Sequence, residues 1–202
     1  MFDLFRKSNA GWRGNEPTKF VIDCFEKGYF KPGIKVLDIG SGFGRNSNWL
    51  ALKGAIVTAI NINRSEIRDA KINAKKLGVN VNYLRVDATR LPFEDKTFDI
   101  ALDLGCSHML SEEGQVKAET EVARILKSGG HLIYFGFSKS HPAYKTKPES
   151  PQFRNLEDVI KIYGNHFQIL STEETSWKPD PAEKSNFTKH VGLNIVMQRK
   201  IN

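Results

Sequence analysis

Long apolar stretches and cysteine are both scarce in this sequence. No run approaches the roughly 20 consecutive apolar residues that a membrane-spanning helix requires. The first seven residues are too polar for a signal peptide, so we expect a cytoplasmic protein. Cys24 and Cys106 are the only cysteines and lie far apart, which predicts neither a disulfide framework nor a metal site.

Runs of charge of one sign are also missing. Thirty Lys and Arg against 23 Asp and Glu give a net charge of +7, yet the basic residues are dispersed among acids. A partner nucleic acid is therefore not expected. No internal repeat is present, and 202 residues with 40% hydrophobic content predict one domain over residues 1–202.

A glycine-rich turn is the most informative feature that is present. The stretch Val36 to Gly44 reads VLDIGSGFG, an apolar run that passes through Gly40, Gly42 and Gly44 into a helical pattern. This G-x-G-x-G spacing differs from the G-x-G-x-x-G of dinucleotide-binding turns. Asp38 can either order the loop or accept a hydrogen bond from an ammonium group. The stretch predicts a strand, turn and helix that hold a cofactor.

Hydrophobic periodicity around this turn predicts alternating strands and helices, as in a doubly wound Rossmann-like α/β sheet. Further strands are expected at 55–60, 81–86, 98–103, 131–137, 167–171 and 191–198. Helices are expected at 18–30, 48–53, 64–77, 111–127 and 156–163, with a short helix before residue 15 completing a cap over 1–30. Segments 138–154 and 176–190 contain several prolines and are predicted to be substrate-side loops.

Four motifs in this order resemble the class I S-adenosylmethionine-dependent methyltransferases over about residues 33–137. They are VLDIGSGFG from Val36, Asp87-Ala88, LPFEDKTFD from Leu91, and EVARILKSGG from Glu121. Within the family, GRNS from Gly44 and DLGCSH from Asp103 are similar to small thiopurine and tellurite-resistance methyltransferases.

The resemblance implies a seven-stranded sheet, mostly parallel with an antiparallel last strand. It also implies S-adenosyl-L-methionine as cofactor, lying across the carboxyl ends of the first strands. The residues that it places at the cofactor are Asp38, Gly40, Ser41, Gly42, Asn61, Ile62, Asp87, Ala88 and Asp103.

Asn61 departs from the family pattern, which has an acid at the end of the second strand to accept both ribose hydroxyls. An amide has a single acceptor oxygen, so the sequence predicts weaker cofactor binding or a rearranged ribose contact. Asn61 is equally well suited to be a helix N-cap. If Asn61 takes the place of the family's acid at the ribose, Asn61→Asp is expected to preserve or tighten cofactor binding.

The sequence indicates the residues that would bind the methyl acceptor less clearly. His108, five residues past Asp103, is a candidate general base or a structural residue of the pocket wall. Trp12 and Tyr144 are candidates to close the substrate pocket, with ordinary aromatic packing as the alternative. Cys106 is expected to be buried packing rather than a nucleophile.

The function that these patterns favour is methyl transfer to a small-molecule acceptor with a sulfur, selenium, tellurium, nitrogen or oxygen nucleophile. One alternative is a non-catalytic or repurposed S-adenosylmethionine-binding domain that regulates a partner. A nucleotide-cofactor oxidoreductase is disfavoured by the glycine spacing and by Asp38. Methylation of RNA or protein is disfavoured by the lack of an added binding domain. A homodimer remains compatible with the sequence.

Overall fold

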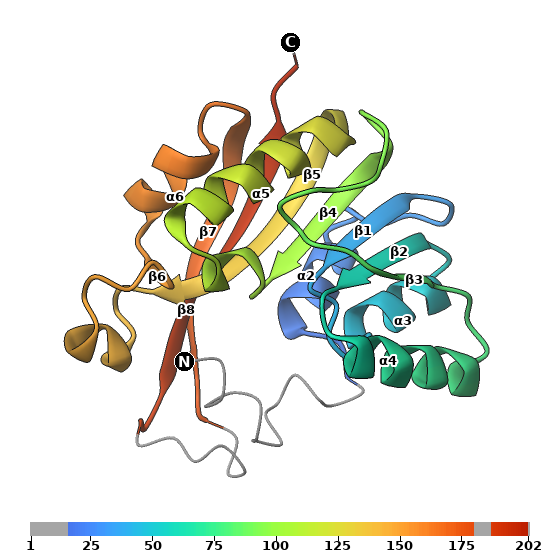
Figure 1. Cartoon of the computed structure of the whole chain (residues 1–202), viewed down its shortest axis with the longest axis horizontal. Coiled ribbons are helices and arrows are strands. Elements are labelled where there is room, and N and C mark those ends of the chain that lie inside the picture. Colours follow the sequence, from blue (N-terminus) through green and yellow to red (C-terminus); the bar gives the residue numbers. More distant parts are fainter. Residues whose placement is uncertain (1–15, 180–186, 202) are drawn as a thin grey trace.

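The protein forms one mixed sheet with helices on both faces (Figure 1). The computed structural model describes residues 16–179 and 187–201, so the predicted helix before residue 15 and Trp12 lie outside the described residues. The strands are β1 Lys35–Ile39, β2 Ile56–Asn61, β3 Asn82–Arg85, β4 Phe98–Leu104, β5 Leu126–Ser138, β6 Phe153–Arg154, β7 Phe167–Trp177 and β8 His190–Arg199. The helices are α2 Lys19–Glu26, α3 Arg45–Leu52, α4 Arg64–Leu77, α5 Glu112–Ile125 and α6 Leu156–Tyr163, with 3-10 turns η2 Ser107–Met109 and η3 Pro142–Thr146.

The strand order confirms the doubly wound prediction. It runs β3-β2-β1-β4-β5-β8-β7, and the neighbouring pairs from β3 to β5 are parallel. The last strand, β8, lies antiparallel between β5 and β7, as predicted. The two-residue strand β6 pairs with the end of β5 outside this path, so the described chain has one short strand more than the seven expected.

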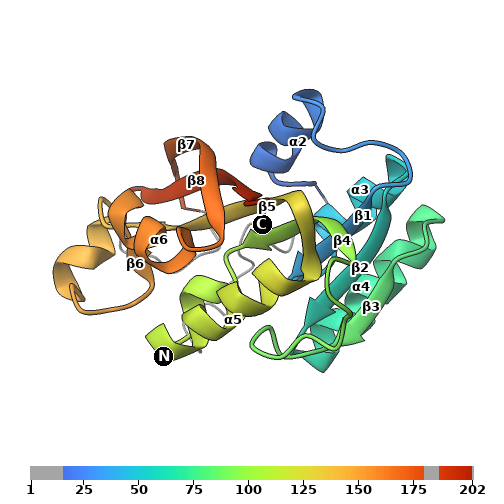
Figure 2. The same cartoon turned by 90° about the horizontal axis from the view of Figure 1, so that it is seen from above.

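Separate hydrophobic cores cover the two faces of the sheet. Alternate strand residues such as Val36 and Ile133 pack with Val21 and Cys24 of α2, whereas their neighbours Leu37 and Leu132 belong to the core under α5 and α6. A third, smaller core joins α4 to β2 and β3. Figure 2 shows α2 and α5 on opposite sides of the sheet. Successive residues along each strand point to opposite cores, so both faces of the sheet are buried.

The carboxyl ends of the parallel strands meet at one edge of the sheet. Asp38 in β1 pairs with Ala59 in β2 and with Leu102 in β4, which brings the loops after all three strands together. This edge is where ligands bind in open α/β sheets.

Several predicted boundaries were wrong, and pairing across the sheet explains the differences in β5 and β7. Strand β5 begins at Leu126 rather than at residue 131, because residues 128–130 form a bulged part of the strand, with a register shift opposite β4. Strand β7 continues to Trp177, because all of its later residues pair with β8. The predicted loop 138–154 contains η3 and β6.

Candidate cofactor and acceptor site

The glycine turn connects β1 to α3 and is anchored on β2. The backbone amides of Gly40 and Ser41 both donate to Ile60 O, at 2.9 and 3.0 Å. These two N–H donors are therefore already hydrogen-bonded within the protein, so a ligand at this turn has to contact other atoms of the turn.

Gly40 and Gly42 are needed for different reasons. A Cβ at Gly40 would lie 2.5 Å from Cys106 Cβ, so this glycine lets the turn pack against the loop that follows β4. Gly42 has a φ of +54° and no atom within 4 Å of an added Cβ, so it borders open space. Both have positive φ, which disfavours other residues. The turn thus packs tightly on one side and is open on the other.

Asp38 orders this turn. Its side chain is 2% exposed, and Ser47 Oγ, in the first turn of α3, donates to Asp38 Oδ2 at 2.5 Å. Burial raises the pKa of Asp38 to about 6, while the Ser47 hydrogen bond and the charge of Arg45 oppose the rise. Of the two roles considered from sequence, the contacts show the loop-ordering one.

Asp103 plays the corresponding part at the end of β4. Its Oδ1 accepts from the backbone amides of Cys106 and Ser107, both at 3.1 Å, and so fixes the entry to η2. Burial raises its pKa. Because Asp103 pairs in register with Ile39, beside Asp38, two buried carboxylates lie under the same edge. Together they favour a cation there.

Asn61, at the end of β2, is linked to Glu66, a residue that the sequence reasoning did not single out. Asn61 Nδ2 donates to Glu66 Oε2 at 2.8 Å, and Asn61 Oδ1 accepts from Asn63 N at 3.1 Å. The helix N-cap is Asn63, whose Oδ1 accepts from Ser65 N, so the N-cap interpretation of Asn61 was wrong. A carboxylate is thus present beside Asn61. The sequence signal for this carboxylate is a Glu at the third position of a helix that follows a strand ending in a polar residue.

The ends of β2 and β3 present three more of the residues predicted to lie at the cofactor. Ile62 is 59% exposed although it is apolar. Asp87 Oδ1 accepts from the backbone and hydroxyl of Thr89, at 2.9 and 2.8 Å, and Ala88 is buried. Val86 N donates to Asn61 O at 3.2 Å, which holds the two strand ends together.

His108 lies in η2 on the acceptor side and is only 2% exposed. Its ring packs against Phe135 and Phe137, and burial lowers the pKa of His108 to about 4. The ring is therefore neutral and weakly basic at neutral pH, which opposes a general-base role. Cys106, two residues earlier, has its pKa raised by burial and by nearby carboxylates, so its thiol is not activated.

The two predicted substrate-side loops meet at a pair of histidines. His141 Nε2 and His190 Nδ1 are 2.8 Å apart, and Phe187 packs against His141 at 5.5 Å between centroids. Tyr144, in η3, packs against Phe153 at 5.9 Å. The loops come together on the side of β5 that carries Phe135 and Phe137.

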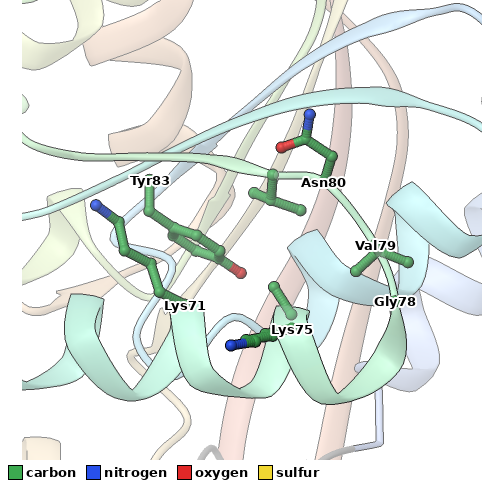
Figure 3. Close-up of a pocket in the computed structure, with 8 residues that line it drawn as sticks. Lys71, Lys75, Gly78, Val79, Asn80 and Tyr83 are labelled. Atoms are coloured by element: carbon green, nitrogen blue, oxygen red, sulfur yellow. The ribbon is translucent and has the colours of Figure 1, made fainter.

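The pocket in Figure 3 is not part of this site. It is lined by Lys71, Lys75 and Tyr83 and by the residues that connect α4 to β3. This connection lies at the amino ends of the parallel strands, whereas the glycine turn lies at their carboxyl ends. Among residues 16–179 and 187–201, no group of three His, Cys, Asp or Glu side chains is placed to hold a metal ion. Within the same residues, no helix is long and apolar enough to cross a membrane.

Comparisons with known proteins agree with this geometry. Residues 37–134 match the family model described as a methyltransferase domain. The chain is 34% identical over 191 residues to the ubiquinone/menaquinone biosynthesis C-methyltransferase UbiE of Haemophilus ducreyi, covering 88% of this chain and 70% of that protein. It is 33% identical over 170 residues to sterol methyltransferase-like 1 of Botryococcus braunii, covering 82% of this chain and 40% of that protein.

A solved structure shows the same fold. It was determined in work on the conversion of a disulfide bond into a thioacetal group during echinomycin biosynthesis, and it aligns with a TM-score of 0.82 at 19% identity, covering 99% of this chain and 89% of the other. The chain spans 40% to 59% of the length of the first curated relatives that it matches.

The chain belongs to the class I S-adenosylmethionine-dependent methyltransferase family. Within it, the relatives found are UbiE-type and sterol methyltransferases. The narrower resemblance to thiopurine and tellurite-resistance enzymes is therefore not supported. Family membership also removes the oxidoreductase alternative.

The residues at the edge fit S-adenosylmethionine, the family's methyl donor. Open space borders Gly42, and the exposed Ile62 offers an apolar face beside the ends of β2 and β3. Ser41 Oγ is buried with no hydrogen-bond partner in the described chain, which leaves a polar atom for a ligand. The carboxylates of Asp38 and Asp103 suit a cation.

Gly40→Ala is expected to destabilise the protein by about 2 kcal/mol or more, because its Cβ would overlap Cys106 Cβ and its φ is positive. Urea unfolding measures this change. Adding Cys106→Gly removes the overlapping atom and is expected to recover part of the loss, whereas Cys106→Ala keeps the Cβ and recovers less. Equal recovery by both second substitutions would contradict the proposed contact.

The Glu66 contact reverses the sequence-based expectation for Asn61→Asp. The new carboxylate would lie beside Glu66 Oε2, where Asn61 Nδ2 now donates at 2.8 Å. We therefore expect lower stability and weaker binding of S-adenosylhomocysteine, measured by thermal melting and calorimetry. Adding Glu66→Gln should reverse both losses. Unchanged stability in the single variant would show that the Asn61–Glu66 hydrogen bond is absent in solution.

Proposed function

We propose that this chain is an S-adenosylmethionine-dependent methyltransferase that acts on a small molecule. The observation that carries the proposal is the glycine turn, packed against Cys106 through Gly40 and bordered by open space at Gly42. Family membership supports methyl transfer, and UbiE, by its name, transfers methyl to carbon. We therefore add carbon to the acceptor atoms considered from sequence.

The proposed cofactor roles follow from position at the sheet edge. Asp38 and Asp103 hold the two turns and provide negative charge beneath the methionine end. The polar pair Asn61 and Glu66 lies where the ribose hydroxyls would be. Ile62 and Ala88 would pack against the adenine, with Asp87 at its rim.

Bound S-adenosylmethionine supplies a methyl group on a positively charged sulfonium. Transfer is an in-line displacement, so the protein has to align the acceptor, exclude water and stabilise the positive charge of the bound cofactor. The buried carboxylates provide that electrostatic stabilisation, and the rings near His108 provide an apolar acceptor side. No protein nucleophile is required.

Calorimetry with S-adenosylhomocysteine tests the proposal directly. We expect micromolar binding by the unaltered chain and methyl transfer to some member of a small-molecule panel. Gly42→Val should abolish binding, because its side chain would fill the open space and is strained at positive φ. Gly78→Val is the matched control, since Gly78 also has positive φ and open surroundings but ends α4 at the other edge. Absence of binding by the unaltered chain would refute the function.

The affinity for S-adenosylmethionine is expected to rise with pH. Asp38, with a pKa of about 6, is mostly protonated and neutral at lower pH and is ionised above it. The gain between about pH 5 and about pH 7 should reach up to about tenfold, the ratio of the ionised fractions. Asp38→Asn keeps an acceptor for Ser47 but carries no charge, so its affinity should be low and nearly independent of pH. An unchanged pH profile in Asp38→Asn would exclude Asp38 as the source.

A further inference from the structure

Strand β3 forms one end of the sheet, and its outer edge has no neighbouring strand within the described chain. It pairs with β2 alone, in one parallel register from Asn82 to Arg85. Figure 2 shows β3 and β7 at opposite ends of the sheet. The register of β7 shifts between Ile169 and Ser171, and a bulge of this kind hinders the addition of another strand. The regular edge of β3 carries no such obstacle among its described residues.

The backbone of β3 offers hydrogen-bonding groups to this outer edge. Val86 N donates to Asn61 O, and every second residue of a parallel strand bonds to the same neighbour. Leu84 therefore faces β2, whereas Tyr83 and Arg85 direct their N–H and C=O groups away from it. An extended peptide that adds to a sheet edge pairs with groups of this kind.

Four cationic side chains of α4 run along the same edge. Their spacing of i, i+4, i+7 and i+11 places them on one flank of the helix, next to its buried positions. Asn73 marks the other flank, since its side chain donates to Phe43 O in the glycine turn. The set, here called the basic stripe, consists of Arg64, Arg68, Lys71 and Lys75.

The charge of the basic stripe is largely uncompensated. All four side chains are exposed, and three of them form no ion pair among residues 16–179 and 187–201. The exception is Arg68, which pairs with Asp69 at 3.2 Å at the surface, where an ion pair is weak. Glu66, the other acid of α4, accepts hydrogen bonds from Asn61 and Asn63 instead. The stripe thus presents positive charge to a ligand that lies along β3.

A cavity of about 400 Å³ lies between α4 and β3. Ala74, Val81 and Tyr83 line it with apolar groups, and Figure 3 shows Lys71 and Lys75 beside the Tyr83 ring. Apolar walls with two ammonium groups suit a side chain that has an apolar stem and a carboxylate at its end. Glutamate has this form, so the cavity is complementary to an acidic side chain.

The length of the basic stripe matches that of a short strand. Arg64 and Lys75 are 11 residues apart, which is about 16 Å along a helix at about 1.5 Å per residue. An extended segment covers this length in about five residues, and every second side chain points to the same face. Acids at alternate positions would therefore all face the stripe. Lysine beside a sheet edge also discourages neutral strands from pairing, so the charge selects the partner.

We propose that β3 and the basic stripe form a docking site for an acidic, extended segment of a partner protein, which adds to β3 as one more strand and places acids at alternate positions opposite α4. A nucleic acid would meet the same charge, but it would leave the outward N–H and C=O groups of Tyr83 and Arg85 unpaired. Docking there goes beyond the proposed function, because it requires neither the cofactor nor the methyl acceptor.

Fluorescence anisotropy with labelled peptides and the full chain at low salt tests the inference. The probe is the acetylated peptide Glu-Thr-Glu-Val-Glu-Thr-Glu, and its control, Glu-Glu-Glu-Glu-Thr-Val-Thr, has the same composition and charge. We expect the alternating peptide to bind about fivefold tighter or more, because only it can pair with β3 while all its acids face α4. Equal affinities, no binding, or tighter binding of a thymidine oligonucleotide of equal charge would overturn the inference.

Lys75→Glu and Lys76→Glu form a matched pair of variants. Both lysines are exposed in the last turn of α4, and both substitutions change the net charge equally, but only Lys75 belongs to the basic stripe. Lys75→Glu should weaken binding of the alternating peptide about tenfold, and Lys76→Glu by less than about twofold. Equal weakening by both variants would mean that the peptide follows overall charge, which contradicts a docking site.

Amide hydrogen exchange reports the strand pairing itself. With the alternating peptide at saturation, exchange of the Tyr83 and Arg85 amides should slow by about tenfold or more, because their N–H groups become hydrogen-bonded. The Leu84 amide faces β2 and should change little. Bound peptide with unchanged exchange at Tyr83 and Arg85 would rule out addition to β3.

Discussion

Two buried carboxylates determine the shape of the edge on which this structure depends. Asp38 joins the end of β1 to α3 through Ser47, and Asp103 joins the end of β4 to η2 through two backbone amides. Burying an ionisable group is unfavourable unless hydrogen bonds compensate it, and here each bond also fixes a turn. The contact between Gly40 and Cys106 then holds the two turns against each other.

This arrangement divides the edge into two regions of different chemistry. Carboxylates and backbone turns lie on the proposed cofactor side, where a sulfonium would be held. On the other side, aromatic and imidazole rings extend from His108 across the end of β5 to the β7–β8 hairpin. The separation would be useful in methyl transfer, since the sulfur loses its positive charge as the methyl group leaves, a neutral acceptor releases a proton, and an apolar acceptor side keeps water away.

The end of β2 shows how contacts can replace an expected residue type. The family pattern places an acid at position 61, and this chain has Asn61 instead. The Asn61 amide donates a hydrogen bond to Glu66 in the first turn of α4, so a carboxylate is still present at the strand end. Hydrogen-bond partners of this kind depend on how the helix docks on the sheet, and a residue-by-residue match to a family motif does not reveal them.

Local periodicity and short motifs were enough to predict the alternation of strands and helices, the glycine turn and the family. Contacts between distant segments were needed to show that Asp38 and Asp103 order turns, that residues 128–130 belong to β5, and that rings from His108 to His190 lie together. Each of these results depends on pairing or packing between segments far apart in the chain. Residue spacing carries no information about which buried side chains meet, so the acceptor side became visible only in the folded protein.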